Sequence, residues 1–265
     1  MKVDLNERVA IVTGGAHGIG RAIVQALSDN GAHIVIVDID GEAGEKAANE
    51  IIEDGGACMS LAGDVSDAEQ MKAVAEQVMD QLGRINILIN NAGINTRSDR
   101  VPIHQYSLED WNRILDVDLT GVFVTSRAII PEILKNPDGG RIVNTSSIAG
   151  LVPLRLQTAY IAAKAGVANL TKSMAIELGS EGILVNAVAP GSTLTRGTEA
   201  LFYGPNGAYT ENAASLLSHI PLGRPGKVEE IAHAVLFLVS PGASYVNGVV
   251  LPVDGGWTAG YVREW

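Results

Sequence analysis

The sequence predicts an α/β protein built on a doubly wound, seven-stranded parallel sheet with helices on both faces. Short and fully apolar runs such as residues 9–12 are typical of strands buried on both sides, and they alternate with longer helix-favouring segments. This alternation favours parallel strands joined by crossover helices. No shift in composition and no internal repeat divides the chain, so we expect one domain spanning residues 1–265.

The expected elements alternate along the whole chain. Strands are predicted over residues 9–12, 33–37, 58–62, 87–89, 140–145, 183–188 and 248–253. Helices are predicted over residues 21–29, 42–53, 67–82, 108–130 and 228–239, with one more that carries Tyr160 and ends at residue 178. Ser66 with Glu69 has the spacing of a capping box, Ser107 with Asp110 signals another helix start, and Pro131 is expected to end the long fourth helix.

The first strand runs directly into the glycine-rich turn T-G-G-A-H-G-I-G, residues 13–20, which precedes a helix. Glycines let a pyrophosphate approach the backbone, while free N–H groups and the helix dipole favour its negative charge. Strand, turn and helix in this order predict a dinucleotide site. His17, within the turn, is expected to contribute weakly and to be solvated or bonded to backbone.

Asp38 ends the second predicted strand, about 20 residues beyond the glycine turn, where a carboxylate can accept both ribose hydroxyls and repels a 2′-phosphate. No Arg or Lys occurs in the turn or directly after Asp38. We therefore expect NAD rather than NADP. The alternative is that Asp38 only begins the turn at residues 40–41.

Small or polar residues follow two further strands. Asp64 and Val65 come after the third strand, and Asn91, Ala92 and Gly93 come after the fourth. In an open parallel sheet the ligand crevice lies beyond the carboxyl ends of the strands. We expect the first pair to border the adenine and the second group to lie near a ribose, with a plain turn as the alternative for the latter.

The stretch from residue 145 to residue 164 reads as an active site. Tyr160 and Lys164 are four apart in an alanine-rich run, so they share one helical face and can interact. A nearby ammonium group would stabilise the phenolate of Tyr160 and make it a proton acceptor. Ser147 would hold a substrate oxygen beside the phenol. Taken singly, the Tyr-Lys pair could be a solvated helix face and the serines a turn.

Four cations fall near the expected substrate region, namely Arg97, Arg100 and His104 after the fourth strand and Arg155 between Ser147 and Tyr160. Surface placement is the alternative for each. Guanidinium groups would grip a polyhydroxylated or anionic substrate such as a polyol, sugar or sugar acid.

Residues 191–218 form a long connection that we expect to be a substrate lid. Its apolar run at residues 201–203 keeps a fatty acyl ketone open as an alternative substrate. The tail, residues 254–265, contains Trp257, Tyr261 and Trp265, and we expect it to pack on a neighbouring subunit, because such residues rarely stay in water.

Composition excludes several classes of function. The net charge of −11 and the absence of a basic block argue against nucleic acid or anionic lipid as a partner. No apolar run is long enough for a membrane span, and the N-terminus has no secretory h-region. A single cysteine, Cys58, expected to be buried filler, fits a reducing compartment, so the cytoplasm is expected. One cysteine with scattered histidines cannot form the usual zinc site, and no metal is expected.

Taken together, the motifs resemble the short-chain dehydrogenase/reductase family over nearly the whole chain. The resemblance rests on residues 13–20, Asp64, residues 90–93, Ser147, Tyr160 with Lys164, Asn186, Pro190 with Gly191, and residues 254–256. It implies that Tyr160 is the acid/base, that Ser147 positions the reacting oxygen, and that Lys164 holds the nicotinamide ribose. It also implies a homotetramer. The expected cofactor contacts are Gly14, His17, Gly18, Ile19, Gly20, Asp38, Asp64, Val65, Asn91, Ala92, Gly93, Thr145, Tyr160, Lys164, Pro190, Gly191, Thr193 and Thr195.

One position departs from the family pattern. Asp118 stands where the family usually has a catalytic asparagine, whose backbone carbonyl holds a water that leads to the lysine. A backbone group survives a change of side chain, so the proton relay is expected to remain. The added carboxylate could raise the pKa of Lys164 or attract a water.

The expected function is hydride transfer between a nicotinamide cofactor and a secondary alcohol or carbonyl, with a sugar, polyol or sugar acid as substrate. The nearest alternative is a 3-oxoacyl-thioester reductase. A more distant alternative is a regulator that binds a nucleotide without catalysis, which an intact Ser147, Tyr160 and Lys164 disfavour.

Overall fold

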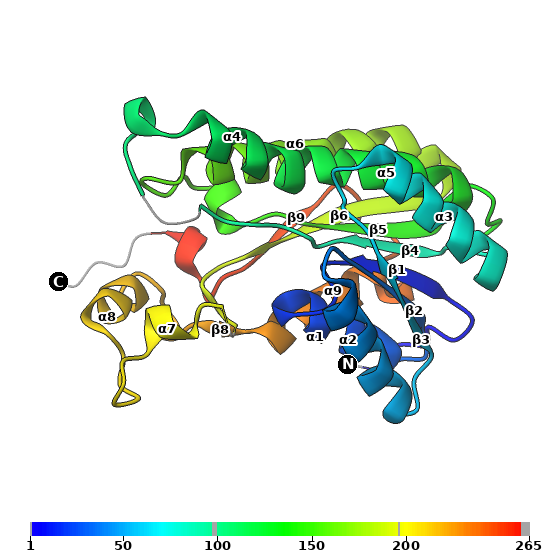
Figure 1. The fold of residues 1–265 in the computed structure, drawn as a ribbon, viewed down its shortest axis with the longest axis horizontal. Helices are drawn as coiled ribbons and strands as arrows, with labels where there is room; N and C mark the ends of the chain where they lie inside the picture. Colours follow the sequence, from blue (N-terminus) through cyan, green and yellow to red (C-terminus); the bar gives the residue numbers. More distant parts are fainter. Residues whose placement is uncertain (1, 97–99, 196, 261–265) are drawn as a thin grey trace.

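A computed structural model describes residues 2–96, 100–195 and 197–260. Its centre is a seven-stranded sheet of order β3-β2-β1-β4-β5-β6-β9 in which every neighbouring pair is parallel (Figure 1). The strands are β1 (Val9–Thr13), β2 (His33–Asp38), β3 (Cys58–Ala62), β4 (Ile87–Asn90), β5 (Gly140–Thr145), β6 (Ile183–Pro190) and β9 (Val250–Val253). The predicted doubly wound α/β fold in a single domain is confirmed.

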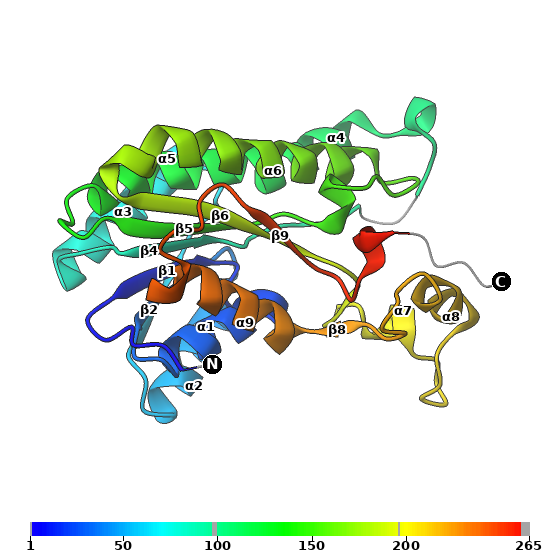
Figure 2. The same ribbon diagram turned by 180° about the vertical axis from the view of Figure 1, so that it is seen from behind.

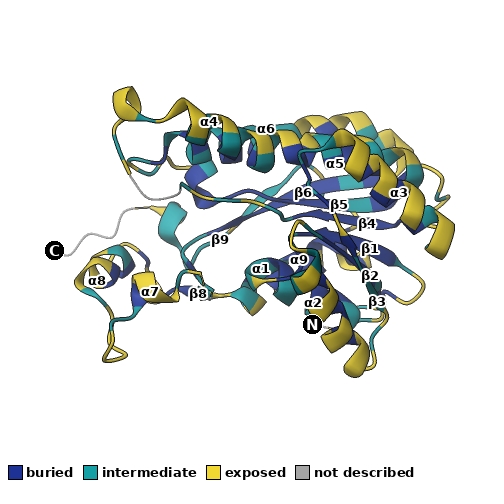
Figure 3. Cartoon of the chain, in the orientation of Figure 1, coloured by how far each residue is buried: buried dark blue, intermediate teal, exposed yellow. Residues whose placement is uncertain are grey.

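Helices cover both faces of this sheet, as Figures 1 and 2 show from opposite sides. One face carries α1 (Gly18–Ser28), α2 (Gly41–Glu53) and α9 (Val228–Val239), and the other carries α3 (Ala68–Leu82), α4 (Leu108–Leu115), α5 (Gly121–Ile133) and α6 (Thr158–Leu178). Each layer encloses its own apolar core against the sheet. The central strands are buried along their length (Figure 3), because apolar side chains on both of their faces meet helices.

The strand order positions the candidate site. β1 lies between β2 and β4, so the chain winds outward in opposite directions from this point. Connections leaving the carboxyl ends of these two halves diverge and leave a crevice between them. Thr13, Asp38, Asn90, Thr145 and Pro190 end their strands at this edge of the sheet.

Residues 108–130 are helical as predicted, but the prediction of one regular helix was wrong. A π-helical turn, Asp116–Thr120, separates α4 from α5, and the N–H of Gly121 donates to the oxygen of Asp116 five residues earlier. Pro131 also does not end the helix, because α5 continues to Ile133. Proline only removes one N–H near the helix end, and the buried side chain of Ile133 holds the last turn in the core.

A second correction concerns the start of α3. Ser66 does not cap this helix; the N-cap is Asp67, whose carboxylate accepts the N–H groups of Glu69 and Gln70. An ionised carboxylate is a stronger acceptor than a hydroxyl for these N–H groups. Ser66 instead donates its hydroxyl to Asp64, at 2.7 Å.

The segment over residues 191–218 is more ordered than a plain loop. It contains β7 (Thr193–Leu194), which pairs with β8 (Gly226–Lys227), and two short helices, α7 (Glu199–Phe202) and α8 (Glu211–Leu217). These helices project at one end of the molecule, at the left of Figure 1. Phe202 and Leu217 belong to a small apolar cluster against which Trp257 packs.

Trp257 contacts the lid segment of its own chain, and packing of the tail on a neighbouring subunit stays a prediction. Tyr261 and Trp265 lie outside the described residues, and for them the prediction stands untested. Among residues 2–96, 100–195 and 197–260, no helix combines the length and the apolar character that crossing a bilayer requires.

Candidate active site

The glycine turn has the close backbone packing expected of a phosphate cradle. Gly14 and Gly18 have φ of 62° and 54°, in the left-handed region that favours glycine. A Cβ atom on Gly20 would lie 2.0 Å from the oxygen of Gly14, so no side chain fits at the start of α1. The exposed ring of His17 occupies the N-cap position without making a capping bond. The N-terminus of α1 is thus left open to an anion.

Asp38 lies at the end of β2 beside this turn. One carboxylate oxygen accepts the N–H of Ala16 at 3.1 Å, and the other accepts the N–H of Asp40 at 3.2 Å. The carboxylate is therefore anchored to the glycine turn itself. Its placement next to the cradle agrees with the predicted position for a ribose-binding carboxylate.

Residues after β4 pack directly on the glycine turn. Asn91 donates its side-chain amide to the backbone oxygens of Thr13 and Gly14, and the hydroxyl of Thr13 accepts the N–H groups of Asn91 and Ala92. The Asn91 amide is thus used to fix the turn, and the backbone of Ala92 packs against Gly14. Thr13 is a residue that sequence reasoning treated only as part of the motif.

The residues after β3 lie at the same carboxyl edge of the sheet. Asp64 accepts the N–H and hydroxyl of Ser66, so its side chain holds the turn that leads into α3. Val65 is buried and would contact a Cβ on Gly121, at the start of α5, at 2.7 Å. Val65 therefore packs between the end of β3 and the start of α5.

Lys164 and Asp118 form a buried ion pair at the centre of the site. The Lys164 Nζ lies 3.1 Å from the Asp118 Oδ2, and their side chains are 4% and 0% exposed. Nζ also donates to the backbone oxygen of Thr145 at 3.1 Å, and it lies 5.7 Å from the centroid of the Tyr160 ring. Burial alone lowers the pKa of Lys164, but the Asp118 carboxylate and the Tyr160 oxygen outweigh it, so this pKa is raised above 10.5. The lysine is an ammonium group at neutral pH.

The carboxylate of Asp118 is held from a second side. Its Oδ1 accepts the N–H of Ile94 at 2.7 Å, so the π-helical turn is tied to the chain that leaves β4. Gly93 covers the ion pair: a Cβ there would lie 3.2 Å from the Lys164 Nζ and 3.3 Å from the Asp118 Oδ2. The raised pKa of Lys164 is one of the two effects expected of this added carboxylate, whereas its direct ion pair with the lysine was not expected.

Ser147 lies in the turn after β5 that packs on α6, the helix that carries Tyr160. Ser147 is buried directly after β5, and its Oγ accepts the N–H of Ala149, while Ser146 donates to the backbone oxygen of Lys164 at 2.8 Å. The serine segment is thereby fastened to α6 at the lysine. Tyr160 is half-buried one turn before Lys164. Thr145 has a buried hydroxyl with no hydrogen-bond partner in the described chain.

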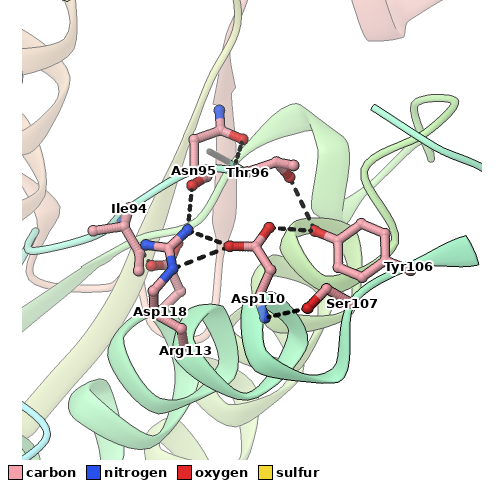
Figure 4. A network of polar contacts seen from close by, with 8 residues as sticks. All are labelled: Ile94, Asn95, Thr96, Tyr106, Ser107, Asp110, Arg113 and Asp118. Atoms are coloured by element: carbon pink, nitrogen blue, oxygen red, sulfur yellow. Dashed lines mark hydrogen bonds and ion pairs between the residues drawn. The ribbon is translucent and has the colours of Figure 1, made fainter. Parts of the chain in front are cut away.

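A polar network fixes the chain between β4 and α4 (Figure 4). Arg113 bonds the carboxylate of Asp110 and donates to the backbone oxygen of Asn95 at 2.9 Å. The hydroxyl of Tyr106 lies 3.0 Å from that of Thr96 and donates to Asp110. Partial burial raises the pKa of Tyr106. Both ends of the connection that carries the predicted substrate cations are therefore pinned to α4.

Of those cations, Arg100 lies against the active-site helix. Its guanidinium nitrogens are 3.0 and 3.3 Å from the side-chain oxygen of Gln157, in the amide orientation that satisfies both groups. Gln157 is 6% exposed and sits one turn before Tyr160. The preceding Leu156 has a φ of 65°, a strained conformation that turns the chain into α6. Sequence reasoning missed Gln157, since a single glutamine near a helix start carries no distinctive signal.

The other predicted cations are less informative. Arg155 and His104 are exposed, and Arg97 lies outside the described residues. Arg100 is thus the predicted substrate cation for which the structure supplies a partner next to Tyr160.

The end of β6 completes the crevice opposite α1. Gly191 donates its N–H to Val253, and a Cβ on it would lie 2.8 Å from the Cα of Asp254, so Pro190 and Gly191 pack tightly on the end of β9. Thr195 is bonded to the hydroxyl of Thr198. Ile19 and Thr193, the remaining predicted contacts, are half-buried and buried respectively.

No group of three or more His, Cys, Asp or Glu side chains is arranged to hold a metal ion in the part of the chain that the structure describes. Cys58 is partly buried in β3, and burial raises the pKa of its thiol to about 11.

Comparison with known proteins identifies relatives along nearly the entire chain. A family model described as enoyl-(acyl carrier protein) reductase matches residues 14–258. The chain is 40% identical over 254 residues to the 3-oxoacyl-(acyl-carrier-protein) reductase FabG of Vibrio harveyi, which covers 96% of this chain and 98% of the relative. It is 39% identical over 254 residues to the D-threitol dehydrogenase of Mycolicibacterium smegmatis, covering 96% of this chain and 94% of the relative.

A solved structure also matches this chain over nearly its entire length. It belongs to a candidate NAD(P)-dependent gluconate 5-dehydrogenase of Beutenbergia cavernae and contains NADP at low occupancy. The TM-score is 0.88 at 37% identity, and the match covers 97% of this chain and 99% of the other. The relatives' names span acyl and polyol substrates, so they define a family rather than a substrate. This chain belongs to the short-chain dehydrogenase/reductase family of oxidoreductases, which use NAD or NADP.

Proposed function

We propose that this protein transfers a hydride between NAD and a secondary alcohol or carbonyl compound, with Tyr160 as the acid/base. The observation that carries the proposal is the fixed position of Lys164. Its Nζ is held by Thr145 and Asp118, both at 3.1 Å, and lies 5.7 Å from the centre of the Tyr160 ring. A lysine that only solvated a helix face would not be buried to 4% exposure between two elements.

The crevice fits a dinucleotide. The start of α1 presents N–H groups, and the oxygen of Gly14 leaves no room for a side chain at Gly20. The buried hydroxyl of Thr145 has no hydrogen-bond partner in the described chain, and a ligand would provide one. Gly14, Gly18 and Gly20 would line the pyrophosphate. Asp38 would accept the ribose hydroxyls. When bound, NAD would supply the hydride acceptor or donor.

Each of three side chains has a role in the proton transfer. Tyr160 gives its proton to, or takes it from, the reacting oxygen. Ser147 donates a hydrogen bond to the same oxygen and fixes its direction. Lys164 stabilises the phenolate of Tyr160 by its charge and holds the nicotinamide ribose.

Asp38 supports NAD over NADP. Its carboxylate is anchored to Ala16 and cannot easily turn away from a 2′-phosphate. The NADP in the Beutenbergia cavernae structure is a property of that protein. The proposal for this chain rests on its own carboxylate next to the glycine turn.

For the substrate we propose a sugar, polyol or sugar acid. Arg100, bonded to the buried Gln157 one turn before Tyr160, would offer guanidinium donors to the substrate. Donors of this kind suit hydroxyl and carboxylate groups. The identity to D-threitol dehydrogenase agrees with this class. Residues 191–218 would cover the substrate as a lid.

A 3-oxoacyl-thioester reductase is the second candidate. It is favoured by the 40% identity to the Vibrio harveyi FabG and by the apolar lid, where Leu201 is 61% exposed. A regulator without catalysis is disfavoured, because Ser147, Tyr160 and Lys164 occur together at the crevice.

Absorbance of the reduced nicotinamide tests the proposal. The purified protein would be incubated with NAD or NADP and a panel of polyols, sugar acids, cyclic alcohols and, in the reverse direction, 3-oxoacyl thioesters. We expect turnover with NAD and polyols or sugar acids. Arg100→Ala should raise KM for the preferred substrate by about tenfold, Arg155→Ala tests the second predicted contact, and the exposed Arg127→Ala serves as the control. Turnover of thioesters alone would favour the second candidate.

We further propose a cytoplasmic homotetramer. Phe123 on α5 and Ile176 on α6 are 53% and 84% exposed, and such apolar surface is costly to leave in water. Light scattering should give four subunits per particle, and Ile176→Asp should reduce that number. A monomeric wild-type protein would contradict the assembly.

A further inference from the structure

The positive charge of Lys164 and the negative charge of Asp118 meet beside Tyr160, so Asp118 weakens the field of the lysine beyond the pair while the ammonium group still faces the phenol at close range. Lys164 contributes one positive charge and Asp118 one negative charge, their atoms lie 3.1 Å apart, and both side chains are buried. Where an asparagine occupies the position of Asp118, the lysine charge is not compensated. This exchange of residue changes the electrostatic potential at the carboxyl ends of β4 and β5.

The carboxylate cannot move away from the lysine. Its second oxygen is fixed by the N–H of Ile94 at 2.7 Å, and the π-helical turn sets the direction of the side chain. Gly93 lies over the pair, and a Cβ at this position would come within 3.2 Å of the Lys164 Nζ. The pair therefore lies beneath the backbone of Gly93, with no side chain from that residue over it.

We propose that Asp118 compensates the charge of Lys164 and thereby makes the site favour the oxidised, positively charged nicotinamide over the reduced, neutral one. This inference rests on the proposed function and adds a direction to it. An uncompensated ammonium group would repel the oxidised ring but not the reduced ring. The enzyme would thus be tuned to hold the cofactor form that an alcohol oxidation consumes.

The ratio of two affinities isolates this effect. Adenosine, pyrophosphate and both riboses are common to the two forms of the cofactor, so their contacts cancel in the ratio of the Kd for NAD⁺ to that for NADH. What remains is the interaction of the protein with the charge and shape of the nicotinamide ring. A side chain that only positioned Lys164 would change both Kd values by the same factor.

The experiment compares wild type, Asp118→Asn and Asp116→Asn by calorimetric titration with NAD⁺ and with NADH. Asparagine keeps the size of the side chain and the acceptor for Ile94. Asp116 is an exposed residue of the same π-helical turn, so its variant loses the same formal charge without touching Lys164. Titration near pH 6.5 favours the ammonium form of Lys164 even in the Asp118→Asn variant, where no carboxylate opposes the lowering of its pKa by burial.

We expect Asp118→Asn to raise the ratio of Kd(NAD⁺) to Kd(NADH) by roughly tenfold, the size expected for one uncompensated charge several Å away in a partly wet site, and Asp116→Asn to leave it unchanged. An unchanged ratio in Asp118→Asn, or an equal change in Asp116→Asn, would overturn the inference. Asp118→Ser gives the same readout if the asparagine variant fails to fold, as checked by circular dichroism. Failure of the wild type to bind either form would instead overturn the proposed function itself.

Discussion

A Cβ atom on Gly18 would lie 3.5 Å from the Cγ2 of Thr195, so the first residue of α1 directly faces the segment that follows β6. Two connections that leave opposite halves of the sheet approach each other here. Their separation is set by a glycine on one side and a threonine on the other.

The first prediction concerns the packing of the glycine turn. Gly20→Ala would put a methyl group 2.0 Å from the oxygen of Gly14 and force the start of α1 to move. We expect a loss of about 1–3 kcal/mol in the free energy of unfolding and at least a tenfold rise in the Kd for NAD. Chemical denaturation and calorimetric titration measure the two effects. Gly226→Ala is the control, because its nearest contact would be an ordinary 3.7 Å.

The second prediction concerns the acid/base. Tyr160→Phe removes one oxygen from a half-buried ring, so the fold and the Kd for NAD should change little. The turnover rate should fall by about 10²–10⁴, the usual contribution of such a group. Steady-state kinetics at saturating NAD measure this loss. Tyr245→Phe, at a fully exposed residue, should behave as wild type, and undiminished turnover in Tyr160→Phe would remove the phenol from the mechanism.

The third prediction concerns stability at alkaline pH. Because the pKa of Lys164 is raised above 10.5 in the folded protein, its contribution to stability is complete below pH 10.5 and is lost as the pH rises through the folded value. Asp118→Asn should cost about 3 kcal/mol near neutral pH, since it leaves a buried cation unpaired. The difference in melting temperature between wild type and variant should shrink above pH 10.5. A difference that stays constant with pH would show that the two groups do not titrate together.

The fourth prediction concerns the choice of cofactor. Asp38→Asn keeps an acceptor for the N–H of Ala16 but removes the charge that repels a 2′-phosphate. We expect the ratio of Kd for NADP to that for NAD to fall by about tenfold or more. Asp40→Asn is the control, because asparagine caps α2 as well as aspartate does. Wild type that binds both cofactors equally would contradict the role given to Asp38.

Much of the fold was predictable because its signals are local. Runs such as residues 9–12 predict a buried strand from composition alone, and the order of strand, glycine turn and helix fixes where the crevice lies. The break between α4 and α5 was not predictable, since Asp118 in the π-helical turn accepts the N–H of Ile94, a contact between residues 24 apart along the chain. The N-cap of α3 was assigned to the wrong residue for a simpler reason. Asp67 directly follows Ser66, and both side chains are able to cap a helix.

In the candidate site, too, local signals were predictable and contacts between distant residues were not. Tyr160 and Lys164 could be paired from their spacing on one helix. The ion pair of Lys164 with Asp118, and the bond of Arg100 to Gln157, join elements whose relative placement only the folded chain defines. Sequence reasoning located the cations but could not assign partners to them.

The small cluster of Phe202, Ala213, Leu217 and Ile220, with Trp257 against it, is separate from the two main cores of the sheet. In the proposed enzyme, the residues of this cluster can consequently be exchanged without weakening the layers that hold the glycine turn and the lysine. One scaffold of this design is thus able to acquire new specificities by drift in a few apolar positions while its hydride chemistry stays intact.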